Sequence, residues 1–172
     1  ELAYRFELPT GLSDTLRSVQ IHFSPSVNDA SSDPFFLQIW DDSAGQPGQL
    51  IYTTDDVNLP TFYYPQYNLG VNGFCQYELP YEVPVSGTYY IGWKQSSANR
   101  LNIGFDKNIN RQNDIFYKTG TAWNNTIFEG AIKLTCNSLF EISHLTFSIS
   151  PKWYLVITDC SCVFDIISQK IG

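Results

Sequence analysis

The stretch that decides the fold is FFLQIWDDSAGQPGQLIY, residues 35–52. Over residues 35–40, large apolar side chains recur with the two-residue period of a β-strand that is packed on at least one face. Residues 41–48 supply turn chemistry, because Gly tolerates positive φ, Pro presets φ and Asp can hydrogen-bond the nearby backbone. Strand character resumes at residues 49–53, so the stretch predicts a β-hairpin with a long polar loop.

The same pattern recurs along most of the chain. Further short strands separated by turn residues are expected at residues 1–8, 18–23, 74–79, 83–85, 88–95, 101–105, 115–118 and 129–134. Aromatic residues make up 16% of the chain and charged residues only 16%, a balance that suits pleated, half-buried surfaces. Trp40 and Trp93 lie within expected strands and are assigned to the core. These patterns predict an all-β chain, an antiparallel β-sandwich that is jelly-roll-like, with few and short helices.

A change in composition near residue 134 divides the chain. Its 172 residues suit one domain, but no glycine lies between Gly130 and Gly172, and three of the four cysteines follow residue 134. We therefore assign residues 1–134 to the β-sandwich module and residues 135–172 to a C-terminal segment of uncertain structure. Two explanations for this segment stand side by side: a divergent end of the protein, or an aberrant end produced by a frameshift.

An ordered set of motifs carries a family resemblance. WDDSAGQPGQLIY at 40–52 is followed by VSGTYYIGWKQ at 85–95, LNIGFDKN at 101–108, FYKTGTAWNN at 116–125 and EGAIKL at 129–134. Together they resemble a module of secreted and cell-surface proteins of Bacteroidota, which often end in a sorting domain for type IX secretion. The resemblance covers roughly residues 15–134. Similar modules continue into a Leu-Arg-Pro-like stretch, whereas this chain reads LTCN at 134–137.

The resemblance implies a jelly-roll fold, a non-catalytic accessory or adhesive role, and neighbouring domains in a larger chain. Composition adds to the expectation of a secreted or cell-surface protein, because Asn, Ser, Thr, Tyr and Gly are frequent and Lys is rare. The formal net charge of −7 argues against nucleic acid, whose phosphates call for clustered Lys and Arg. No run of roughly 18 apolar residues is present, so we expect no membrane insertion.

Catalytic machinery is not evident in the sequence. The chain has two histidines, His22 and His144, and the alternation around His22 predicts that its side chain points to solvent. The adjacent carboxylates of residues 41–42 and 55–56 would point to opposite faces of a strand, which makes them a poor acid and base pair. We expect no enzyme, and a hydrolase is the least favoured function.

A calcium site is one alternative for the polar loop. Asp41 and Asp42, with the carbonyl groups of the glycine-rich turn, offer the hard oxygen ligands that Ca²⁺ prefers. The spacing of an EF-hand loop is missing, and an Asp at the start of a turn more often caps its own backbone. No cofactor is otherwise expected.

Aromatic clusters make carbohydrate the favoured ligand. Sugar C–H faces pack on aromatic rings while nearby amides and carboxylates bind the hydroxyls. Tyr63, Tyr64 and Tyr67 crowd one proline-flanked loop, and Trp123-Asn124-Asn125 offers a second platform. A glycan or another surface component is therefore the expected partner. The alternative is a structural spacer without a ligand, in which these rings close the end of the core.

The cysteines allow one disulfide to be considered. Cys75 stands alone in the first 134 residues, and a free thiol is expected there, with a Cys75 to Cys136 bridge as the alternative. Cys160 and Cys162 are too close in sequence to bridge comfortably.

Overall fold

A computed structural model describes residues 1–24, 30–65, 73–98 and 102–138 of the chain. Its main sheet has seven strands, in the order β10 (Asn124–Asn125), β9 (Ile115–Tyr117), β1 (Leu2–Glu7), β7 (Thr88–Gln95), β3 (Pro34–Ser43) and β4 (Gln46–Thr53), with β5 (Phe62–Tyr63) pairing with β3. A second sheet has the order β12 (Leu134–Ser138), β2 (Ser13–His22) and β6 (Phe74–Ser86). A small third sheet pairs β11 (Ala131–Ile132) with β8 (Phe105–Asp106).

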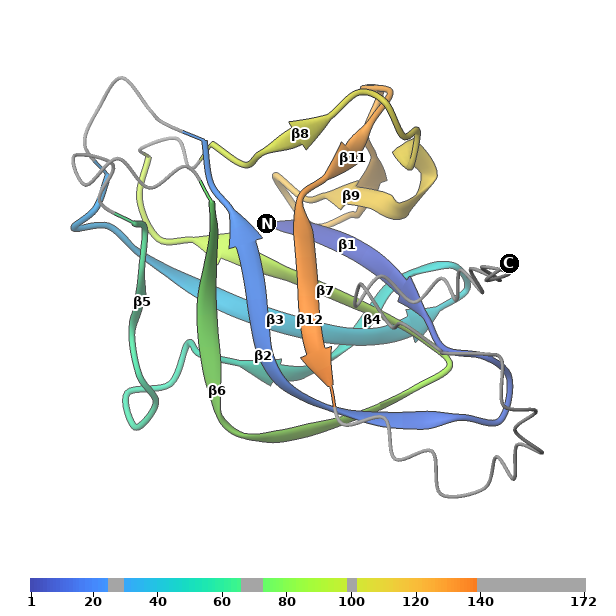
Figure 1. Cartoon of the computed structure of the whole chain (residues 1–172), viewed down its shortest axis with the longest axis horizontal. Helices are drawn as coiled ribbons and strands as arrows, with labels where there is room; N and C mark the ends of the chain where they lie inside the picture. Colours follow the sequence, from blue (N-terminus) through green and yellow to red (C-terminus); the bar gives the residue numbers. More distant parts are fainter. Residues whose placement is uncertain (25–29, 66–72, 99–101, 139–172) are drawn as a thin grey trace, which may run out of the picture.

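The architecture is an antiparallel β-sandwich, as the sequence predicted. Every strand pair is antiparallel, and successive strands such as β1, β2 and β3 alternate between the two main sheets in the manner of a jelly roll. Figure 1 shows the strands of the three-stranded sheet crossing those of the seven-stranded sheet at a steep angle, with β8 and β11 at one end. Within the described ranges the helical structure is one 3-10 turn, η2 (Gln112–Asp114), and no helix there has the length and apolarity to cross a bilayer.

The core lies between the two main sheets because alternate side chains of their strands point inward. From the three-stranded sheet, β2 contributes Leu16, Val19 and Ile21, all fully buried. From the seven-stranded sheet, the inward-facing residues include Leu37 and Trp93. Such burial contributes roughly 1.5–3 kcal/mol for each large apolar side chain, so this layer is the main source of stability.

A second, smaller cluster covers the outer face of the seven-stranded sheet. It consists of Ala3, Trp40, Tyr90 and Phe116, and Trp123 packs against it. We call this set the outer-face cluster. Trp40 and Trp93 are both buried, as predicted, but they lie in different clusters on opposite faces of the sheet.

Gly92 allows two strands of the large sheet to approach closely. A Cβ at this position would lie 1.9 Å from the carbonyl oxygen of Leu2 on the neighbouring strand β1. The pairing of Gly92 with Ala3 therefore requires a residue without a side chain, and both residues are buried.

The hairpin at residues 35–53 is tighter than its sequence suggests. We expected a long polar loop over residues 41–48, but β3 runs through Ser43 and β4 begins at Gln46, which leaves Ala44 and Gly45 as the turn. Their φ angles of 55° and 83° are the positive values that a type I′ turn requires at both central residues. The acidic and glycine-rich residues beside the turn are thus paired strand residues.

Other boundaries differ in detail. Residues 74–79 and 83–85 belong to one strand, β6, whose pairing with β2 shifts register between Leu16 and Ser18. Of the strand expected at 101–105, residue 101 lies outside the described residues; Ile103 makes an isolated bridge with Phe23, and only Phe105 belongs to a named strand.

The C-terminal part of the described chain crosses the expected module boundary. Strand β12 continues past residue 134 to Ser138 and pairs with β2 along this length. Residues 135–138 therefore belong to the sandwich, whereas residues 139–172 lie outside the described part of the chain. His144, Cys160 and Cys162 are among these residues.

Candidate functional site

Trp123 is the predicted platform residue that the structure ties most closely to the sheet. Its ring meets Trp40 edge-on, with centroids 5.2 Å apart and planes at 83°, as part of the outer-face cluster. The Lys118 ammonium lies 4.8 Å from the centroid of the same ring, within the range of a cation–π contact. Trp123 nevertheless remains partly exposed. Part of its indole ring and the Lys118 ammonium therefore lie side by side at the surface.

The side chain of Asn124 points to the opposite face of the sheet from the outer-face cluster, on which Trp123 packs. Asn125 is paired with Phe116, a member of the outer-face cluster, whereas Asn124 is paired with Tyr117. Since successive residues of a strand point to opposite faces, Asn125 shares the outer face and Asn124 does not. Asn124 is exposed and donates from Nδ2 to the carbonyl oxygen of Ala122 at 3.2 Å.

Of the two polar neighbours of Trp123, Asn125 was part of the predicted platform and Lys118 was not predicted as a site residue. Lys118 and Asn125 join Trp123 because β9 and β10 form a hairpin in which Tyr117 pairs with Asn124. Asn125 donates from Nδ2 to the carbonyl oxygen of Asn113 at 3.1 Å. The turn residues between Lys118 and Trp123 in the sequence were the signal for this hairpin.

The predicted tyrosine cluster is divided between surface and core. Tyr63 is 50% exposed, and its backbone carbonyl accepts a hydrogen bond from the Tyr77 hydroxyl at 3.1 Å. Tyr64 is only 2% exposed; its ring packs against Phe23 and its hydroxyl donates to a backbone carbonyl. The structure thus assigns Tyr64 to the core, which removes it from a ligand surface. Tyr67 lies outside the described residues.

The two predicted platforms lie at opposite sides of the large sheet. Tyr63 belongs to β5, which pairs with β3, whereas Trp123 precedes β10 at the far end of the strand order. Between β10 and β5 run β9, β1, β7 and β3. The two platforms are not brought together into one site, so each must be tested separately.

The carboxylates of the candidate metal ligands Asp41 and Asp42 accept hydrogen bonds from different groups. The Asp41 carboxylate accepts a hydrogen bond from the backbone N–H of Gln49. The Asp42 carboxylate accepts one from the N–H of Gly45 at 3.2 Å and one from the Tyr90 hydroxyl at 2.7 Å. Among the described residues, no group of three or more His, Cys, Asp or Glu side chains is arranged to hold a metal ion. The two carboxylates therefore stabilise the hairpin, and a calcium role stays a prediction.

His22 is more enclosed than its strand pattern predicted. Its ring lies edge-on to Phe74, with centroids 5.6 Å apart. Nδ1 is buried and has no hydrogen-bond partner among the residues described. The backbone of Gly104 lies close against the ring, and this is possible because glycine has no side chain: a Cβ there would lie 2.6 Å from Nδ1. The imidazole is therefore packed between neighbouring segments and does not point freely to solvent.

Cys75 and Cys136 are not bridged to each other, and the Cys136 sulfur lies 3.9 Å from the Tyr89 hydroxyl. Cys75 is partly buried and Cys136 is buried. They pair with Ile21 and Val19 respectively, on opposite sides of β2, so a whole strand separates them and the alternative disulfide is not formed. Burial raises the pKa of the Cys75 thiol, which lowers its reactivity at neutral pH.

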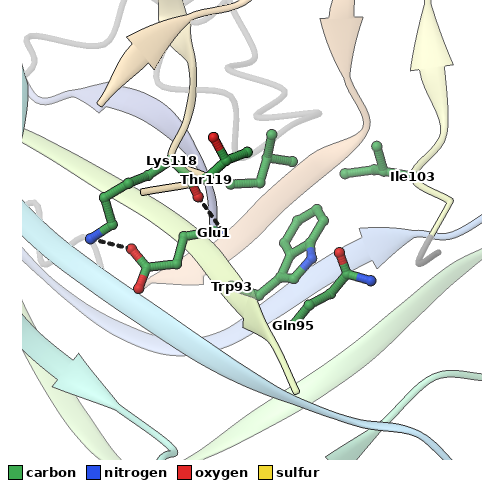
Figure 2. A pocket seen from close by; sticks show the side chains of 7 residues that line it. Glu1, Trp93, Gln95, Ile103, Lys118 and Thr119 are labelled. Atoms are coloured by element: carbon green, nitrogen blue, oxygen red, sulfur yellow. Dashed lines mark hydrogen bonds and ion pairs between the residues drawn. The ribbon is translucent and has the colours of Figure 1, made fainter. Parts of the chain in front are cut away.

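A surface pocket of about 290 Å³ opens beside the first residue of β1. Figure 2 shows the indole of Trp93 and the side chain of Ile103 on one side of it, and Lys118 with its ion-pair partner Glu1 on the other. Its volume is at the lower end of the range for small-molecule sites, about 300–1,000 Å³. Trp93 is only 4% exposed, so the pocket offers little aromatic surface to a sugar ring.

Comparison with known proteins gives no assignment: neither a protein-family model nor a curated protein nor a solved structure matches this chain.

Proposed function

We propose that this chain is a non-catalytic accessory or adhesion module of a secreted or cell-surface protein, and that it binds a glycan at Trp123. The module would be joined to neighbouring domains of a larger chain. The observation that carries the proposal is the partly exposed indole of Trp123, fixed on Trp40 and accompanied by Lys118.

The chemistry of this surface suits a sugar. The exposed part of the indole provides an apolar surface for sugar C–H groups, while Lys118 provides a donor for hydroxyl oxygens. The Nδ2 of Asn125 already donates to backbone carbonyls, so this amide offers its Oδ1 as an acceptor for a sugar hydroxyl. Because the Lys118 ammonium pairs with the Glu1 carboxylate, the surface carries little net charge. A neutral glycan therefore fits it better than a polyanion. Tyr63, with half of its side chain exposed, is a separate secondary contact.

The first test is a glycan-array screen of the full chain, in the presence of Ca²⁺ and then of a chelator. Trp123→Ala should abolish any signal that this platform supports, and Trp123→Tyr should retain part of it because a ring is kept. Phe74→Ala is the matched control, since Phe74 is a 46% exposed aromatic residue on the three-stranded sheet. Circular dichroism and the melting temperature must show that each variant is folded.

The outcomes separate the proposal from its alternative. Binding that is lost in Trp123→Ala and kept in Phe74→Ala supports a glycan-binding module. A folded protein that binds no glycan on the array supports the structural spacer, which the burial of Tyr64 favours. Binding that depends on Ca²⁺ and is lost in Asp42→Ala would move the site to the β3–β4 hairpin.

A further inference from the structure

Strand β4 forms one edge of the seven-stranded sheet and carries no charge. Its sequence, QPGQLIYT, contains no Asp, Glu, Lys or Arg, and its only partner among the described strands is β3. An edge strand presents unpaired N–H and C=O groups to which another chain can add. Proteins normally protect such an edge with charges, prolines or bulges.

The neighbouring edge strand shows the usual protection. Strand β6, at the edge of the three-stranded sheet, contains Pro80 and Pro84, and Glu82 forms an ion pair with Arg17 at 2.6 Å. Proline removes a donor from the edge and a charge resists burial. Strand β4 has only Pro47, next to the turn, so residues 49–53 contain neither a proline nor a charge. A β-bulge at Ile51 interrupts their otherwise unprotected edge.

A β-bulge turns apolar side chains outward at this edge. Tyr52 pairs with Ile39 and Leu50 pairs with Trp40. Ile51 therefore has no partner on β3 and is the extra residue of the bulge. As a result Leu50 and Ile51 are 39% and 42% exposed. A bulge re-aims side chains, and here it presents two consecutive large aliphatic groups.

The edge of the other sheet completes an apolar strip. Tyr81 of β6 is 53% exposed and meets Tyr52 edge-on at 5.3 Å. The hydroxyl of Tyr52 is buried without a hydrogen-bond partner in the described part of the chain. We call Leu50, Ile51, Tyr52 and Tyr81 the edge strip. Within the residues described, it combines a strand edge that has no further partner, exposed apolar groups and a buried hydroxyl without a hydrogen-bond partner.

Acidic residues lie at both ends of the edge strip. Asp41 and Asp42 precede the turn, and Asp55 and Asp56 follow β4. Asp55 is paired with Lys94 at 2.8 Å, whereas the other three have no ion pair within the residues described. A partner with basic residues at its ends would be attracted to both ends of the strip.

We propose that the edge of β4 binds an extended segment of another polypeptide as an additional strand. Main-chain hydrogen bonds to residues 50–53 provide the affinity, as in other cases of β-strand addition; the N–H of Gln49 already donates to Asp41. Alternate apolar side chains of the segment pack on Ile51 and Tyr81, and flanking Lys or Arg residues meet the carboxylates. This interaction is separate from the proposed glycan surface, because β4 and β10 are at opposite ends of the sheet.

The same charges argue against a second copy of the chain as the occupant. In an antiparallel pair of β4 strands related by a two-fold axis, the start of one strand meets the end of the other. Asp42 of one copy would then approach Asp55 and Asp56 of the next. Like charges in such positions destabilise an interface.

The test uses the full chain and a fluorescein-labelled peptide, KTVTVTVTK, measured by fluorescence anisotropy and by amide hydrogen exchange. We expect saturable binding and slower exchange at residues 50–53. Ile51→Lys should weaken binding at least about tenfold, because a charge is placed on the edge. Ile127→Lys is the matched control, since it makes the same substitution at an 80% exposed isoleucine that follows β10, at the other end of the sheet, and should change affinity much less.

Two peptide variants and one further measurement complete the test. The peptide with proline at its central valine should bind at least about tenfold more weakly, and the peptide with glutamate at both ends should also lose affinity. No binding of KTVTVTVTK, or equal binding of its proline variant, would overturn the proposal. Sedimentation analysis that finds a dimer dissociated by Ile51→Lys would overturn it in favour of a second copy.

Discussion

The hydroxyl of Tyr90 on β7 donates a hydrogen bond to Oδ1 of Asp42 on β3, at a distance of 2.7 Å. The second carboxylate oxygen of Asp42 accepts from the N–H of Gly45 in the hairpin turn. The contact therefore connects the outer-face cluster with the turn between β3 and β4. It also leaves Asp42 occupied by protein donors.

Tyr90→Phe should destabilise the protein by about 1.5–3 kcal/mol, the range for a hydrogen bond to a charged group. The ring and its packing are kept, so the loss reports the hydroxyl. Urea unfolding followed by tryptophan fluorescence measures it. Asp42→Asn, which keeps an acceptor oxygen, should cost less than Asp42→Ala; equal losses would show that the side-chain acceptor has no role.

Calcium should not stabilise this hairpin. Asp41 and Asp42 bind Gln49, Gly45 and Tyr90, and an ion would have to replace these donors. We therefore expect the melting temperature to be the same with Ca²⁺ and with a chelator. A rise with Ca²⁺ that disappears in Asp41→Asn would establish a metal site here.

Gly92→Ala should be strongly destabilising. The added Cβ would meet the carbonyl oxygen of Leu2 at 1.9 Å, which requires strands β1 and β7 to separate. Overpacking of this kind costs typically about 1–3 kcal/mol and occasionally more. Gly120→Ala is the control, because no atom lies within 4 Å of a Cβ there. Chemical denaturation of both variants should give a large loss for the first and almost none for the second.

The turn between β3 and β4 can be improved. Ala44 has a φ of 55°, a conformation that costs an alanine more than an asparagine, and Asn-Gly is the preferred pair in a type I′ turn. Ala44→Asn should raise the free energy of unfolding by roughly 0.5–1 kcal/mol, whereas Gly45→Ala should lower it, since Gly45 has a φ of 83°. An unchanged stability in Ala44→Asn would contradict the turn assignment.

Alkaline pH should destabilise the protein in part through Tyr52. Burial and the neighbouring Tyr81 raise the pKa of Tyr52 from 10 to about 12. Because the folded state holds the proton more tightly, this contribution to stability is complete below pH 10 and is lost as the pH rises through 12. Tyr52→Phe should reduce the dependence of unfolding free energy on pH between these values.

At neutral pH the same Tyr52→Phe variant should be as stable as the wild type or more stable, because the buried hydroxyl has no partner in the described part of the chain. Tyr90→Phe provides a contrast, since its hydroxyl is bonded. A large loss of stability in Tyr52→Phe would indicate a partner for this hydroxyl.

The sequence was sufficient for the fold because short apolar stretches alternate with turn residues along the chain. The pattern at residues 88–95 predicted β7 with its observed bounds, and the strands expected at 35–40 and 88–95 placed Trp40 and Trp93 among the buried residues. Burial itself departs from a period of two, since residues 89–93 are all buried. The sequence pattern overestimated the loop at 41–48, because acidic residues and glycines favour turns locally while the type I′ geometry needed only Ala44 and Gly45. The other residues of 41–48 belong to strands, because β3 and β4 pair up to the turn.

The candidate site was less accessible from sequence because it depends on contacts between distant strands. Nothing adjacent to Tyr64 indicates that its ring packs on Phe23, which is far away in the chain. The separation of Trp123 from Asn124 could have been foreseen, since neighbouring strand residues point to opposite faces. The position of Lys118 over Trp123 required knowledge of the β9–β10 hairpin.

The position of β1 between β7 and β9 has a consequence for how the chain folds. The first strand of the described sandwich pairs only with strands that begin at Thr88 and Ile115. During synthesis it stays without these partners until the distant segments have been made. Folds rich in such non-local pairings fold slowly. The large sheet therefore cannot form around β1 until residues 115–117 are available.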